Sequence, residues 1–269
     1  VRASRLIEAG QYAAAADLME SWTARNPGDV EVLALLAEAE FLLGRHDRAE
    51  AAADRALRVS PASPDALWWK GMCLRRRGQA GHEEYLRRAA AGGRPKIWAR
   101  YGQELLRAGR DAEAEGFLQR AYDAGVRDPQ TLSLLAGLAM DAHRYRRADS
   151  LLHEALDRAG PNDATLRVLL ADAQKNDGRY DQAGATLRAA LPAASPADAP
   201  IVLMKLGEVL ILQQSPQEAA ETFAQAARHA GFEVPGWLAA ARCYRQMGRY
   251  EKALECMDRA AEAAPSSEE

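Results

Sequence analysis

A period of 34 residues runs through the chain and constrains its fold more than any other feature. Glycines recur at this spacing at Gly10, Gly44 and Gly78, and prolines recur at Pro27, Pro61, Pro95 and Pro129. Self-similarity at this period is typical of stacked helical hairpins, each of which buries its apolar face only against its neighbours. A core of this kind grows with the number of repeats, so the 269 residues predict a linear array and not a closed globule.

One unit, residues 30–63, shows how a single period is organised. Leu33 and Leu36 begin an apolar stripe at helical spacing, and Gly44 follows where a left-handed residue commonly ends a helix. A second, alanine-rich helix is then stopped by Pro61, because proline has no N–H and restricts the residue before it. The unit therefore predicts a helix, a tight turn, a second helix and a stop.

The residues at fixed places in the period resemble the tetratricopeptide repeat family. That pattern has a large residue early in the first helix, a small residue four places later, a turn glycine, a following aromatic, alanines in the second helix and a closing proline. The last unit carries it at Trp237, Ala241, Tyr244, Gly248, Tyr250, Ala253, Ala260 and Pro265. The resemblance implies an all-α fold, a right-handed α-solenoid of about eight helical hairpins.

We expect one solenoid over residues 1–269, built from approximate units in phase with this pattern. The units are residues 1–29, 30–63, 64–94, 95–128, 129–162, 163–196, 197–233 and 234–269. Alanine and glycine at the small places predict close approach of two helices, whereas large residues fill the space between hairpins.

The third unit departs from the period. Gly78 and Gly109 are 31 residues apart, which is three fewer than the period requires. Counted from Gly78, the small place in the second helix holds Glu83, whereas an alignment gap puts Gly81 there; both alignments stay open. Gly92-Gly93 then precedes the next unit. We expect fewer contacts between helices at this joint than elsewhere, and so the earliest local opening.

Charge and composition exclude several classes of function. The net charge of −3 argues against bulk binding of nucleic acid, which requires a basic field. Residues 70–120 nevertheless hold twelve basic and six acidic groups and form a basic belt between two acidic ends. Arginine outnumbers lysine by 30 to 5, which indicates a GC-rich, bacterial coding sequence. No stretch reaches the ~18 apolar residues of a membrane span.

No motif in the sequence predicts catalysis, a cofactor or a metal. Phosphate-binding loops and nucleophile elbows are absent, and the five histidines are scattered without ligand spacing. The three cysteines, Cys73, Cys243 and Cys256, are odd in number and lack metal-ligand spacing, so we interpret them as buried free thiols. The chain is therefore interpreted as a protein that is not an enzyme.

The resemblance implies that first helices line a concave groove, and one part of that groove is rich in residues of the binding hot-spot type. The predicted partner-binding residues are Phe41, Trp68, Trp69, Met72, Arg75, Arg76, Arg100, Gln103 and Arg107. The Trp68-Trp69 pair leaves two interpretations open. In one, an indole is exposed in the groove beside the arginines; in the other, a tryptophan packs against the next helix and the arginines are merely solvated.

These residues predict a scaffold that holds a peptide or a partner domain, acidic and carrying an apolar anchor, in its groove. Two alternatives stay open: the non-catalytic arm of a larger enzyme of the glycosyl- or sulfotransferase type, and a periplasmic assembly factor for polysaccharide export. The residues do not define the compartment: they favour the cytoplasm, and a leader before Val1 would indicate the periplasm. Leu254, Met257 and Ala261 share one face of the last helix and predict a cover, either further protein or a second copy.

Overall fold

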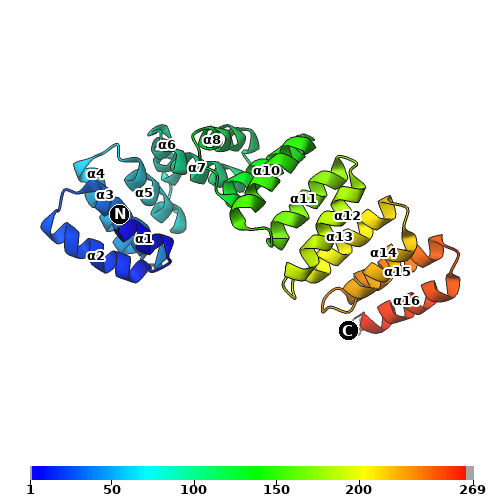
Figure 1. The fold of residues 1–269 in the computed structure, drawn as a ribbon. Coiled ribbons are helices and arrows are strands. Elements are labelled where there is room, and N and C mark those ends of the chain that lie inside the picture. The colour runs from blue at the N-terminus through cyan, green and yellow to red at the C-terminus, as the bar shows by residue number, and fades with distance from the viewer. Residues whose placement is uncertain (1, 265–269) are drawn as a thin grey trace. The chain divides into compact units, whose positions relative to one another are not determined.

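The computed structural model describes residues 2–264, which form sixteen α-helices and one short 3₁₀-helix (Figure 1). The described residues contain no β-strand, so the all-α prediction is confirmed. Among the same residues, no helix combines the length and the apolar character that a membrane span requires.

The chain divides into two compact units, unit 1 up to Val126 and unit 2 from Arg127 onward. The helices of unit 1 are α1 (Arg2–Glu8), α2 (Tyr12–Arg25), α3 (Val30–Leu42), α4 (His46–Val59), α5 (Pro64–Arg76), α6 (His82–Ala91), α7 (Pro95–Arg107) and α8 (Asp111–Asp123). Those of unit 2 are α9 (Pro129–Asp141), α10 (Tyr145–Ala159), α11 (Ala164–Asn176), α12 (Tyr180–Ala190), the 3₁₀-helix η1 (Leu191–Ala193), α13 (Ala199–Leu212), α14 (Pro216–Ala226), α15 (Glu233–Gln246) and α16 (Tyr250–Ala263).

Within each unit the helices occur as consecutive pairs. Each odd-numbered helix, called here a first helix, packs against the even-numbered second helix that follows it, and the pair then packs against the next first helix. Prolines at the first helical turns of α5, α7, α9 and α13 fit this arrangement, because proline is favoured where an N–H has no intrahelical partner.

The turn between the helices of a pair requires a left-handed residue. Glycine supplies it in most pairs: Gly44 has φ of +78° and Gly248 has φ of +72°. His143 and Gln214 occupy the same place in two pairs of unit 2, with φ of +56° and +59°. Residues with a Cβ are disfavoured in this region, so these two turns are more strained than the glycine turns.

Helices of a pair approach closely at the positions that hold small residues, as the sequence predicts. A Cβ added to Gly102 of α7 would lie 2.6 Å from Leu118 Cγ on α8, and one added to Gly207 of α13 would lie 2.5 Å from the ring of Phe223 on α14. Leu118 and Phe223 are themselves buried. Each large side chain thus fills the space that a glycine leaves on the facing helix.

The three cysteines are buried free thiols, as the sequence predicts. Cys73 lies on α5, whereas Cys243 and Cys256 lie on α15 and α16. Burial raises the pKa of the Cys73 thiol to about 11 and also raises the pKa values of the other two, because an apolar surrounding disfavours the thiolate.

The shortened third unit has a distinct second helix. The helix α6 has 10 residues, whereas the second helices α2 and α4 of the same unit have 14 each. Gly81 precedes α6 as its N-cap with φ of +87°, so it fills no packing place within the helix. As the sequence predicts, α6 packs against α7 at far fewer places than α4 packs against α5.

Candidate functional site

All nine predicted partner-binding residues lie on three first helices of unit 1. Phe41 is at the end of α3, the residues from Trp68 to Arg76 are on α5, and Arg100, Gln103 and Arg107 are on α7. The helix α5 packs against both α3 and α7. The three helices therefore lie side by side, and the side chains that they expose to solvent form what is called here the first-helix surface.

The Trp68-Trp69 pair is buried, so the interpretation with an exposed indole is wrong. The exposed fraction of Trp68 is 3% and that of Trp69 is 6%. The ring of Trp69 packs against Phe41 of α3, with ring centroids 5.3 Å apart and the planes tilted by 44°. Both tryptophans belong to the apolar core of unit 1. They support the first-helix surface from beneath and do not form its outer layer.

Arg100 covers the face of Trp69. Its guanidinium lies 5.1 Å from the centroid of the indole, and its Nη2 donates a hydrogen bond of 2.7 Å to Oε1 of Glu38 on α3. Arg100 and Glu38 are 62 residues apart, so the ion pair joins two first helices that α5 separates in the sequence. A cation–π contact of this kind contributes about 0.5–2 kcal/mol. Arg100 therefore covers Trp69 and is held there by Glu38.

One carboxylate, that of Glu104, holds two of the predicted arginines. Arg75 of α5 and Arg107 of α7 both form ion pairs with it, and its side chain is only 9% exposed. The pKa of Arg75 lies below its ordinary value, because burial and then the neighbouring charges of Arg107 and Arg76 disfavour its protonated form. Two guanidinium groups share one carboxylate, so positive charge remains in excess here.

Arg76 and Gln103 differ from the other predicted polar residues. Arg76 is exposed and has neither an ion pair nor a hydrogen bond within residues 2–264. Gln103 and Met72 are half-buried, and Leu42, beside Phe41, is 43% exposed. These side chains are the ones that a partner could contact without displacing an internal ion pair.

Much of the basic belt is neutralised within unit 1. Its positive groups pair with acidic groups of the preceding helices: Lys70 with Glu50 and Asp54, Arg77 with Asp47 and Glu50, and Arg94 with Asp65. The sequence shows a basic segment beside an acidic segment, whereas the structure brings the two together as ion pairs. Glu38 and Glu104 were not predicted as site residues. The sequence could have indicated them, because both lie on first helices and other first helices nearby are rich in arginine.

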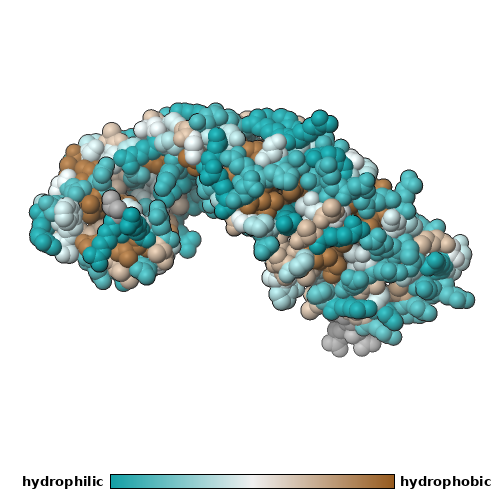
Figure 2. Space-filling model, in the orientation of Figure 1, coloured by the Kyte–Doolittle hydropathy of each residue, from teal (hydrophilic) through white to brown (hydrophobic). Residues whose placement is uncertain are grey.

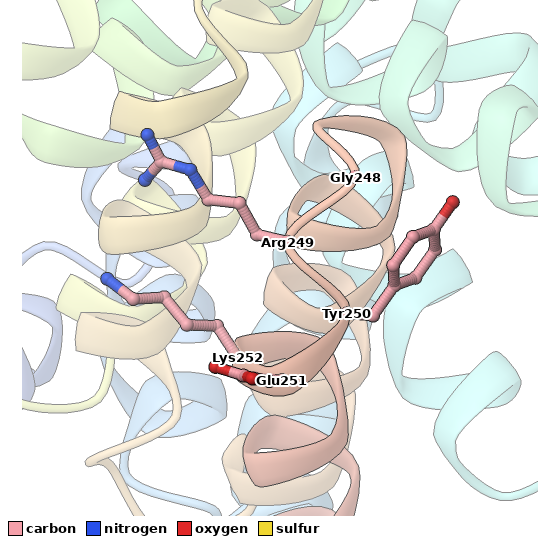
Figure 3. A pocket seen from close by; sticks show the side chains of 5 residues that line it. All are labelled: Gly248, Arg249, Tyr250, Glu251 and Lys252. Carbon is pink, nitrogen blue, oxygen red and sulfur yellow. The ribbon is translucent and has the colours of Figure 1, made fainter.

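Unit 2 exposes apolar side chains of its own, and Figure 2 shows such side chains scattered over a largely hydrophilic surface. On α16, Tyr250 is 67% exposed, Leu254 59% and Met257 52%. A hollow of about 430 Å³ lies at the turn before this helix, lined by residues 248–252. Figure 3 shows Tyr250 directed away from Arg249 and Lys252 there. Self-association through the α16 face stays a prediction.

The sequence comparisons identify the repeats. Two family models, each described as tetratricopeptide repeat, match the chain, one at residues 6–72 and 210–269 and the other at residues 134–199 and 178–232. None of the curated proteins matches the sequence.

Solved structures show the same fold at low sequence identity. A Pseudomonas aeruginosa pilF structure is 17% identical with a TM-score of 0.60, over 76% of this chain and 93% of its own. MamA from Desulfovibrio magneticus RS-1 is 20% identical with a TM-score of 0.56, over 65% of this chain and 97% of its own. The Cut9–Hcn1 structure is 16% identical with a TM-score of 0.60, over 94% of this chain and 48% of that one. The helix pairs, the turn residues and both family models agree, and the chain belongs to the tetratricopeptide repeat family.

Proposed function

We propose that the chain is a non-catalytic scaffold that binds a peptide or a partner domain on the first-helix surface of unit 1. The observation that carries the proposal is the connected set of contacts from Phe41 through Trp69 and Arg100 to Glu38. Contacts of this kind fix α3, α5 and α7 to one another before a partner arrives. A surface that is already ordered loses less entropy on binding.

The partner we propose carries an apolar anchor beside an acidic group. Phe41, Leu42 and Met72 are only partly buried and supply apolar area. Arg76 supplies a positive charge that no carboxylate among the described residues 2–264 pairs with. Arg107 is 56% exposed on its side chain and adds a second positive charge at the edge. The tryptophans act indirectly, because they hold Phe41 and Arg100 in place. Mixed aromatic and guanidinium surfaces are typical of protein–protein hot spots.

Two further functions from the sequence remain alternatives. These repeats would serve as the non-catalytic arm of a larger glycosyl- or sulfotransferase-type enzyme, or in a periplasmic factor for polysaccharide export. The full reading frame distinguishes them from the scaffold, because an α/β catalytic domain supports the first and a secretory leader supports the second.

Site-specific photo-crosslinking tests the proposal. A photoreactive phenylalanine replaces Met72, and the matched control carries it at Arg58, an exposed position on the second helix α4. We expect one partner to cross-link at position 72 and not at position 58. Arg76→Glu is then expected to weaken that partner about tenfold, mainly through slower association at low salt, whereas Arg58→Glu leaves the affinity within about twofold. Equal cross-linking at both positions, or equal affinities of the two variants, would contradict the proposal.

A further inference from the structure

A pocket of about 230 Å³ lies between α5, α6 and α7, beside the first-helix surface. Its apolar side is formed by Leu86 of α6 and by Tyr101 and Leu105 of α7, all of which are buried. Its polar side is formed by Arg75, Arg107 and Arg110, with Glu83, Glu104 and His82 beside them. The sequence predicts Arg75 and Arg107 as partner-binding residues, but it does not predict this pocket.

The shortened third unit accounts for the pocket. In α4, Ala49 lies one turn into the helix and is fully buried. A count from the turn glycine places Glu83 there in α6, but the packing places His82 there. The carbonyl oxygen of His82 and the side chain of Leu86 face Gly71, as those of Ala114 and Leu118 face Gly102 in the next pair. His82 is half-buried and lines the pocket. The first buried residue of α6 is Leu86. The first turn of α6 thus contributes no buried small side chain, and the space beside α5 and α7 stays open.

The charge of the pocket favours an anion. Three arginines face two glutamates in its lining: Arg75 and Arg107 share the largely buried Glu104, and Glu83 is exposed. Arg110 is held at the rim by Glu113 outside the pocket, through hydrogen bonds of 2.8 and 2.7 Å. His82 Nδ1 donates a hydrogen bond of 3.0 Å to the carbonyl oxygen of Gln79 and so closes one end of the pocket. The lowered pKa of Arg75 reflects burial and then the crowding of guanidinium groups.

We propose that this pocket binds an oxyanion, a carboxylate or a phosphoryl group, that the partner carries on an apolar side chain. The inference rests on the proposed function, since it names the chemistry of the group that a partner would insert. The guanidinium groups of Arg75 and Arg107 present N–H donors in the planar arrangement that matches carboxylate and phosphate oxygens. Leu86, Tyr101 and Leu105 provide apolar area for the carbon atoms behind the charge.

NMR of the arginine Nε–Hε groups tests the proposal with small probes. The probes are N-acetyl-leucine, its uncharged analogue N-acetyl-leucinamide, and phenyl phosphate. We expect N-acetyl-leucine to shift the signals of Arg75, Arg107 and Arg110 in a saturable manner, whereas N-acetyl-leucinamide leaves them unchanged. Tighter binding of phenyl phosphate would identify a phosphoryl source, and tighter binding of N-acetyl-leucine a carboxylate source. The absence of saturable shifts with both anions would overturn the proposal.

Two variants separate the pocket from its surroundings. Arg107→Gln removes a partly exposed donor and is expected to weaken anion binding about tenfold, the usual effect of losing one charge-assisted hydrogen bond. The matched control is Arg87→Gln, since Arg87 of α6 is exposed, pairs with Glu84 and does not line the pocket. Equal anion affinities of the two variants would overturn the proposal. If the two variants bind anions equally but Arg76→Glu still weakens binding of the cross-linked partner, the anion pocket is refuted and the proposed scaffold function is not.

Discussion

Two joints between helix pairs, α6–α7 in unit 1 and α14–α15 in unit 2, are built in different ways. At α14–α15 the helices touch, since a Cβ added to Gly236 would lie 2.7 Å from both the Cβ and the backbone nitrogen of Ala227. At α6–α7 the helices meet at far fewer places. One hydrogen bond of 2.8 Å, from Trp98 Nε1 to the carbonyl oxygen of Ala90, links the two helices there. The first joint is stabilised by close packing and the second has little of it.

Long polar side chains connect the helices of unit 1 where packing does not. Arg100 of α7 reaches Glu38 on α3, and Arg94, just before α7, pairs with Asp65 on α5. Ion pairs at partly exposed positions contribute less than buried apolar contacts and are weakened by salt. One repeat pattern is therefore compatible with two kinds of joint, and we expect the two to differ in stability and in response to salt.

The largest expected difference is in hydrogen exchange. Because local stability in a repeat array depends on contacts with neighbours, amides in residues 78–95 are expected to exchange about a hundredfold faster than those in residues 160–190. Exchange measured by mass spectrometry on the whole chain provides both values in one experiment. Equal protection of the two segments would show that the sparse α6–α7 contacts do not weaken the joint.

The second test adds a methyl group to the close-packed joint. Gly236→Ala is expected to lower the free energy of unfolding by about 2 kcal/mol, because the new Cβ meets backbone atoms that cannot move aside. Gly116→Ala on α8 is the control: no atom lies within 4 Å of its added Cβ, so alanine is expected to stabilise by about 0.5 kcal/mol. Denaturant titration measures both. A tolerated Gly236→Ala would mean that close approach does not stabilise α14–α15.

The third test removes one ion pair from each unit. Arg100→Gln is expected to cost about 1 kcal/mol, and less at high salt, because the side chain pairs with the largely buried Glu38 and covers Trp69. Arg188→Gln in unit 2 breaks an ion pair of similar length with Glu218, but the side chains of both partners are about half exposed. We therefore expect the free energy of unfolding to fall by only about 0.3 kcal/mol. Equal losses would show that the cover over Trp69 adds nothing.

The smallest expected effect is at a turn of unit 2. Gln214→Gly relieves the left-handed backbone at the α13–α14 turn and is expected to stabilise by about 0.5 kcal/mol. Gly248→Ala creates the same strain at the α15–α16 turn and is expected to destabilise by a similar or larger amount. Thermal unfolding measures the stability change of each of the two variants. Changes of the same sign would refute the strain at Gln214.

The fold could be predicted because its determinants are local and repeat. Turn glycines, closing prolines and small residues at fixed places each describe one hairpin, and the structure has the expected backbone at Gly44 and the expected close approach at Gly102. The sparse contacts between α6 and α7 also followed from a count of residues between Gly78 and Gly109.

The site could be predicted only in part, because its determinants join distant segments. Hydropathy places Trp69 on a first helix but does not reveal that Arg100 and Phe41 cover it from two other helices. The pairing of Arg100 with Glu38 spans 62 residues, which no local pattern encodes. The pocket beside α6 had one signal in the sequence: a count from Gly78 finds the charged Glu83 where a small residue is expected. The count is one residue out, because the structure places His82 there.

The buried thiols provide each unit with its own chemical probe of local opening. Cys73 is in unit 1, and Cys243 and Cys256 are in unit 2. The thiolate is the form that alkylating reagents attack, and burial keeps all three thiols protonated at neutral pH. Alkylation of a thiol therefore requires that its helix first detach from its neighbours. Timed labelling with iodoacetamide, followed by peptide mass analysis, would record when α5 and α15 separately come loose in the unaltered chain.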